Sequence, residues 1–160
     1  SLILSFVLIC NVFIGNSALI VNAADGDRVT VDNPLDESLP IHVKLEISSH
    51  IAAGTWGVGS PAQDIEQYAV SIVNGTDSVI SDWTITITTN DASSYNSGWN
   101  GVSRSGNIIT ITPYTGEWSN AEIEANSSKG GAGFQIAKSA IESSTIKFTL
   151  GSSKHFICSG

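Results

Sequence analysis

The sequence predicts an all-β domain in which two antiparallel sheets pack as a β-sandwich. From Ile41 onward hydrophobic and polar residues alternate with a period of two, which places successive side chains on opposite faces of a strand. Turn residues separate these runs every ~8–12 residues, and no segment has the ~3.6-residue period of a helix. The 160 residues are enough for one such domain. We expect about nine strands of the immunoglobulin-like or jelly-roll type.

The predicted strands follow one another along the chain, and each has one hydrophobic face. Residues 107–112 and 122–124 are expected to form two shorter strands. His42 falls on the polar side of the first run and is expected to face solvent. The predicted turns lie at Asn74-Gly75, Asn100-Gly101, Ser105-Gly106 and Gly130-Gly131. The expected buried faces, in chain order, are Ile41-Val43-Leu45-Ile47, Tyr68-Val70-Ile72, Trp83-Ile85-Ile87, Phe134-Ile136 and Ile146-Phe148-Leu150.

The N-terminal part of the chain differs from this alternating region. Residues 1–24 contain no charged side chain and end in two alanines, which is typical of a signal peptide; the alternative is a retained membrane anchor. Either form predicts a secreted or cell-surface protein that contacts a membrane only through residues 1–24, if these are not cleaved. Residues 25–40 are polar, acidic and proline-containing, and we expect a linker or leader there. Residues 41–158 then form the sandwich domain.

Charge and cysteine content exclude several classes of function. The chain has 7 Lys and Arg against 15 Asp and Glu, and its net charge of -8 repels nucleic acid and anionic lipid. Cys10 and Cys158 do not form a CxxC pair, and His42, His50 and His155 lack the spacing of metal ligands. We therefore expect no metal site, no cofactor and no nucleic-acid partner.

Carboxylates at alternate positions are the candidates for catalysis, because a glycosidase uses two of them beside the scissile bond. Asp64 with Glu66, and Glu122 with Glu124, each share one face of a strand. A solvated polar face produces the same spacing without any catalytic role. The sequence has no G-x-S-x-G motif and no phosphate-binding glycine loop that opens a helix. We expect that this segment is not an enzyme, and no catalytic residue is assigned.

The 4 tryptophans separate into two groups. Trp83 is in phase with the isoleucines that follow it and is expected in the core. The other three lie among Gly, Ser, Asn and Thr, where no hydrophobic alternation explains burial, and are expected to form an exposed patch: Trp56, Trp99 and Trp118. An indole ring stacks on the apolar face of a pyranose, whose hydroxyls bond to nearby amides. The patch predicts binding to a neutral polysaccharide.

Five motifs, in this order, resemble those of a known family: YAVSIVNGT, ISDWTITI, GWN, WSNAEI and GAGFQ, at residues 68–76, 80–87, 98–100, 118–123 and 131–135. They are similar to family-2 carbohydrate-binding modules, the cellulose-binding domains of bacterial glycoside hydrolases, over residues 41–158. The resemblance implies a nine-stranded sandwich with three surface tryptophans in a row, matching Trp56, Trp99 and Trp118. Gly59 stands where xylan-binding members have an arginine, so the resemblance implies a flat, cellulose-type face.

The resemblance implies a non-catalytic module that adsorbs to cellulose or a related β-glucan, with xylan disfavoured, and that targets a parent glycoside hydrolase or a cell surface. Gln63, Asn100 and Asn120 lie near the matched rings and are expected to bond sugar hydroxyls. The family joins two terminal cysteines; Cys158 matches the second, and the first is absent. The alternatives are a structural or adhesive cell-surface sandwich that binds protein, and a small glycoside hydrolase.

Two N-glycosylation sequons are present, at Asn74-Gly75-Thr76 and Asn126-Ser127-Ser128. They are acceptor candidates if the chain is exported by a eukaryotic cell. In a bacterial protein they have no meaning.

Overall fold

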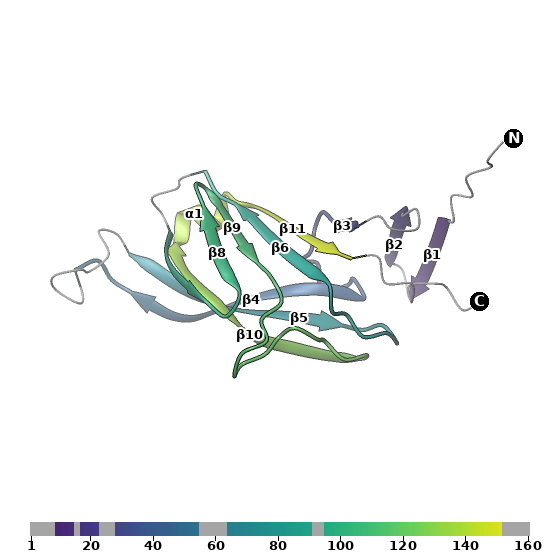
Figure 1. Ribbon diagram of the computed structural model, residues 1–160. Helices are drawn as coiled ribbons and strands as arrows, with labels where there is room; N and C mark the ends of the chain where they lie inside the picture. The colour runs from purple at the N-terminus through teal and green to yellow at the C-terminus, as the bar shows by residue number, and fades with distance from the viewer. Residues whose placement is uncertain (1–8, 15–16, 23–27, 55–63, 91–94, 152–160) are drawn as a thin grey trace, which may run out of the picture.

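The computed structural model describes residues 9–14, 17–22, 28–54, 64–90 and 95–151. Two antiparallel sheets of this described part lie one above the other, as Figure 1 shows. One sheet has four strands in the order β4-β5-β10-β7, and the other has five in the order β3-β11-β6-β9-β8. The predicted all-β, two-sheet antiparallel sandwich is confirmed.

The strand bounds place every predicted hydrophobic run in one of the two sheets. The four-stranded sheet contains β4 (Ile41–Ile51), β5 (Ile65–Asn74), β10 (Ser127–Ala137) and β7 (Tyr95–Trp99). The five-stranded sheet contains β3 (Val29–Val31), β11 (Thr145–Leu150), β6 (Trp83–Thr88), β9 (Ile108–Ile111) and β8 (Val102–Ser105). A further hairpin, β1 (Ile9–Ile14) and β2 (Ser17–Asn22), forms a sheet of its own. The described part of the chain has no helix with the length and hydropathy of a membrane span.

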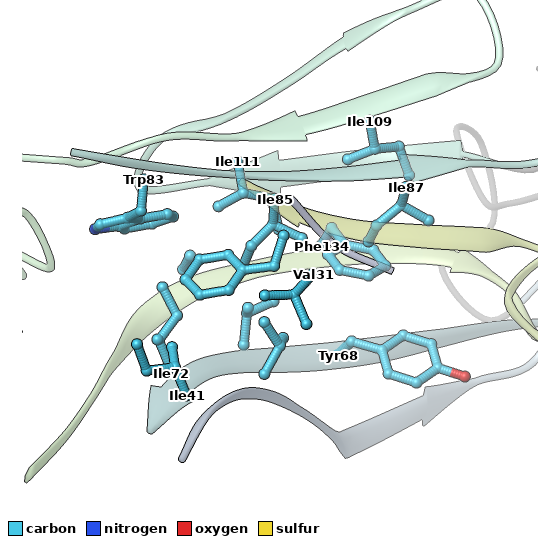
Figure 2. Close-up of a cluster of buried hydrophobic side chains, with 14 of the residues drawn as sticks. Val31, Ile41, Tyr68, Ile72, Trp83, Ile85, Ile87, Ile109, Ile111 and Phe134 are labelled. Atoms are coloured by element: carbon cyan, nitrogen blue, oxygen red, sulfur yellow. The ribbon is translucent and has the colours of Figure 1, made fainter. Parts of the chain in front are cut away.

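The core fills the space between the two sheets, where Figure 2 shows side chains from both layers meeting. Trp83 is 1% exposed, which confirms its predicted place in the core, and Phe134 is fully buried. The rings of Tyr68 and Phe134 stack with their centroids 5.4 Å apart. Each large side chain buried here stabilises the fold by about 1.5–3 kcal/mol. The alternation read from the sequence therefore defines the inner faces of both sheets.

Two residues of β4 differ from their expected burial: one expected in the core is exposed, and one expected in solvent is buried. Ile47 is 56% exposed, although it is in phase with the buried Ile41 and Val43. The β4–β5 pair extends beyond the five-stranded sheet in Figure 1, and the pairing of β4 with β5 shifts register immediately after Ile47, between Ile47 and Ser49. His42 was expected in solvent but is 7% exposed, and its Nδ1 lies 2.8 Å from the carbonyl oxygen of Leu39. The segment before β4 covers it.

The segment expected as a linker contributes to the sandwich. Val29–Val31 forms β3, which pairs with β11, and Val31 is 4% exposed in the core. The backbone N–H of Val43 donates to the carbonyl of Pro34 at 2.6 Å, and that of Gly75 donates to Pro40 at 2.6 Å. The sandwich therefore begins before Ile41.

Three local predictions also differ from the structure. Residues 122–124 form no strand but one isolated bridge, between Ile80 and Ile123. Gly130-Gly131 is not a turn; it lies within β10 at a register shift, where an extra residue bulges from the ladder. A helix, α1 (Lys138–Glu142), joins β10 to β11. Five residues are too short to show a helical period in a sequence, which explains why α1 was not predicted.

Candidate functional site

The outer face of the four-stranded sheet carries a row of polar side chains across all of its strands. Gln135 on β10 lies opposite Gln67 on β5 and opposite Ser97 on β7. Both glutamines are flanked in sequence by buried residues of the core face, so strand alternation points them outward. On β4, Ser48 and Ser49 lie at the other end of the row. The two glutamines, both half-buried, therefore lie in the middle of the outward face of this sheet.

Hydrogen bonds connect this amide row from one edge of the sheet to the other. Asn96 donates from Nδ2 to Oε1 of Gln135 at 2.7 Å, and the Ser97 hydroxyl donates to the same oxygen at 3.0 Å. Gln135 donates from Nε2 to Oε1 of Gln67 at 2.9 Å, and Gln67 donates from Nε2 to the Ser48 hydroxyl at 3.2 Å. These hydrogen bonds hold each amide in one orientation.

Trp99 lies over the sheet immediately beside this row. It pairs with Gly133, two residues before Gln135 on β10, and its side chain is half-buried. A Cβ atom on Gly133 would lie 2.6 Å from Cε2 of Trp99 and 2.7 Å from the carbonyl oxygen of Tyr68. Only glycine leaves room for an indole ring this close to the strand. Because Gly133 has no side chain, the ring of Trp99 packs directly against the backbone of β10 at this residue.

Trp118 is the most exposed of the aromatic residues whose burial is described, with 67% of its surface accessible. Its backbone approaches Gly131, two residues before Gly133, where a Cβ atom would lie 2.9 Å from the Trp118 carbonyl oxygen. Gly131 has a φ of 118°, which favours glycine. The two tryptophans therefore border the same short stretch of β10.

Asn120 holds the loop that carries Trp118. Its Oδ1 accepts a 2.8 Å hydrogen bond from the backbone N–H of Tyr114, and its own N–H donates to the Tyr114 carbonyl at 3.0 Å. Asn120 is only 3% exposed. We expected it to bond a ligand; the structure corrects this, because a side chain buried inside the loop does not reach the surface. Asn120 is a positioning residue for Trp118.

Asn100 ties the other tryptophan to the same strand. It occupies a tight turn between β7 and β8 with a φ of 54°, followed by Gly101 with a φ of 92°, which confirms the predicted turn. Its Nδ2 donates to the carbonyl oxygen of Gly131 at 2.7 Å. The turn that follows Trp99 is therefore fastened to the bulge beside Trp118. Asn100 is half-buried.

The other two predicted ligand residues, Trp56 and Gln63, lie outside the described residues. Sequence reasoning missed the amide row. Part of the signal was present, because Gln67 and Gln135 occupy outward positions of two strongly alternating strands, but only the fold shows that these strands are adjacent.

The carboxylates weighed as catalytic candidates have other neighbours. Asp64 accepts the Ala53 backbone N–H at 2.9 Å. Glu66 is 6% exposed and accepts the Tyr68 hydroxyl at 2.6 Å. Burial, together with this hydrogen bond, raises the pKa of the Tyr68 phenol above its ordinary value. The described residues contain no cluster of three His, Cys, Asp or Glu side chains placed to hold a metal ion.

No protein-family model matches the chain, and no curated protein matches it. Among solved structures it is weakly similar to the GH20 exo-β-N-acetylglucosaminidase of Vibrio harveyi. The chain bound to N-acetylglucosamine has 16% sequence identity and a TM-score of 0.43, and that of an inactive mutant has 16% identity and a TM-score of 0.40. Each match covers 62% of this chain and 13% of the other.

Proposed function

We propose that this chain is a non-catalytic polysaccharide-binding module, secreted or held at a cell surface, that adsorbs to a neutral β-linked glucan through the outer face of its four-stranded sheet. Cellulose is the first candidate, as the family-2 resemblance implies. The observations that support the proposal are the connected amide row with Trp99 beside it, and the exposed Trp118, whose backbone approaches the same stretch of β10.

The two kinds of group suit the two surfaces of a pyranose. An indole ring covers the apolar C–H face of the sugar, and amides bond the hydroxyls around its rim. Four strands spaced about 4.8 Å apart give a surface about 14 Å wide, which fits an extended chain rather than a small enclosed ligand. Because the amides already bond one another, they need little reorganisation when a glycan replaces water.

The charge of the protein favours a neutral ligand. Its net charge of -8 repels acidic polysaccharides, and the groups in the amide row carry no charge. Stacking and neutral hydrogen bonds are screened little by salt. We expect adsorption to change less than about twofold between ~50 mM and ~500 mM salt.

The test is a set of adsorption isotherms for the full chain on microcrystalline cellulose and insoluble xylan, with Trp99→Ala and Trp118→Ala. We expect each substitution to weaken adsorption to cellulose by about tenfold or more, since each ring buries apolar surface worth ~1–3 kcal/mol. The matched control is Thr86→Val, which changes an outward residue of the five-stranded sheet and should leave adsorption unchanged.

The outcomes separate the candidate functions. Retention on cellulose that falls in both tryptophan variants, with circular dichroism unchanged, supports the proposal. Retention on xylan instead would replace the glucan with a xylan ligand. Retention on neither glycan would favour an adhesive sandwich that uses the exposed Trp118 to bind protein.

A further inference from the structure

The two N-glycosylation sequons of the chain lie in opposite environments. Both begin with an asparagine followed two residues later by a hydroxyl side chain, so the sequence does not distinguish them. In the fold, Asn74 is 0% exposed at the end of β5, whereas Asn126 is exposed immediately before β10.

Asn74 uses its amide group to join separate segments of the fold. Its Nδ2 donates to the carbonyl oxygens of Ser78 at 2.7 Å, Glu124 at 3.0 Å and Ile123 at 3.2 Å. Its Oδ1 accepts the backbone N–H of Thr76 at 3.1 Å and the Thr76 hydroxyl at 2.7 Å. A sugar on Nδ2 would replace one of the two amide hydrogens and would need space where there is none.

Asn126 has the properties that Asn74 lacks. Its φ of 52° places it in a left-handed turn at the surface, and the sequon hydroxyl of Ser128 is exposed as well. One hydrogen of its Nδ2 donates to Oδ1 of Asp77 at 2.9 Å. An amide nitrogen has two hydrogens, so the second can be replaced while this bond remains.

We propose that Asn126 is an N-glycan acceptor site of the folded protein and that Asn74, with the same sequon, is not. The donor is a sugar activated as a diphosphate ester. In the transfer, Nδ2 of Asn126 forms a bond to the anomeric carbon, the bond from that carbon to the diphosphate oxygen breaks, and the diphosphate leaves with the electron pair. The amide nitrogen gives one proton to the base of the transferase. This inference does not depend on the proposed polysaccharide binding.

The test uses the folded full chain, made without glycans in a bacterial host. It is incubated with a soluble asparagine glucosyltransferase and a nucleoside diphosphate glucose, and the modified sites are mapped by mass spectrometry. Peptides spanning residues 70–80 and 122–132 establish conditions in which both sequons are substrates. We expect Asn126 to be glucosylated and Asn74 to react at least ~10³-fold more slowly than its peptide, because only unfolded molecules expose it.

A matched variant separates the site from the surrounding contacts. Ser128→Ala removes the sequon but leaves Asn126 and its bond to Asp77, and it should abolish the modification without changing the circular dichroism of the protein. Glucosylation of Asn74 in the folded chain at a rate near that of its peptide would overturn the proposal. So would a rate at Asn126 no faster than that at Asn74.

Discussion

The two outer faces of this sandwich are built by the same alternation and yet differ in chemistry. On the five-stranded sheet, Thr84, Thr86 and Thr88 alternate with fully buried isoleucines along β6, and Thr86 lies beside Thr110 of β9. On the four-stranded sheet, the corresponding outward positions hold Gln67, Gln135, a glycine and a tryptophan. Along β6, the five-stranded sheet thus has isoleucines on its buried face and threonines on its outer face.

This difference identifies outward positions whose residues are not explained by the stability of the strand alone. Threonine is a favourable outward residue in a strand because its branched side chain packs on the pleat. Glycine at the outward position of a strand interior weakens the strand, and Gly133 is explained by the ring of Trp99 and the Tyr68 carbonyl, which leave no room for a Cβ atom. Departures from the simple alternating pattern are therefore the positions at which a site is expected.

The largest effect is expected from adding a side chain at Gly133, where the ring of Trp99 packs on β10. Gly133→Val would place a side chain against the indole ring and against the Tyr68 carbonyl, which lies 2.7 Å from the Cβ position. Overpacking of this kind costs about 1–3 kcal/mol and displaces the ring. We expect a lower free energy of unfolding in urea and a loss of adsorption to cellulose of more than about tenfold.

The comparison with the threonine face provides the control for Gly133→Val. Thr86→Val exchanges an outward hydroxyl for a methyl group of similar volume on β6, and valine is as favourable as threonine in a β-strand. Its unfolding free energy should stay within about 0.5 kcal/mol of the parent. If Gly133→Val adsorbed as well as Thr86→Val, Trp99 would not be part of the binding surface.

The next effect concerns the inner side of the four-stranded sheet. Tyr68→Phe removes the 2.6 Å hydrogen bond to Glu66 and leaves that carboxylate buried, which should lower the free energy of unfolding by about 1–3 kcal/mol near neutral pH. The pKa of the phenol is raised in the folded state, so this stabilisation is fully present below the unfolded pKa of about 10 and is lost as the pH rises above it.

Denaturant unfolding at about pH 7 and about pH 11 measures this dependence. The difference in unfolding free energy between the parent and Tyr68→Phe should shrink at the higher pH. A difference that stays constant would mean that the phenol loses its proton equally well in the folded and unfolded chains.

The fold was predictable because alternation over strands of six or more residues determines which side is buried, as it did for Trp83, Ile85 and Ile87. Its exceptions have tertiary causes. Ile47 is exposed beside a register shift of β4 against β5, and His42 is buried with its Nδ1 2.8 Å from the carbonyl oxygen of Leu39 in the segment before β4. Neither the exposure of Ile47 nor the burial of His42 can be predicted from the local sequence pattern.

The site was predictable in part, since Trp118 is exposed as its polar context indicated. The sequence could not reveal that Asn120 is buried, because its partner Tyr114 lies across a loop of irregular shape. Nor could it show that Gln67 and Gln135, which are 68 residues apart, bond one another. Strand order determines that contact, and strand order follows from the packing of the whole domain.

The smallest expected effect tests whether the amide row takes part in binding or only connects strands. Gln135→Leu keeps the size of the side chain but removes the acceptor of Asn96 and Ser97 and the donor to Gln67. Because these groups lie at the surface, water can replace the lost partner, and the unfolding free energy should change by less than about 1 kcal/mol.

Adsorption to cellulose should weaken by about three- to tenfold, the loss of roughly one hydrogen bond. Thr110→Val on the opposite face should change neither quantity. Equal adsorption by both variants would leave the tryptophans as the binding groups and reduce the amide row to a structural connection across the sheet.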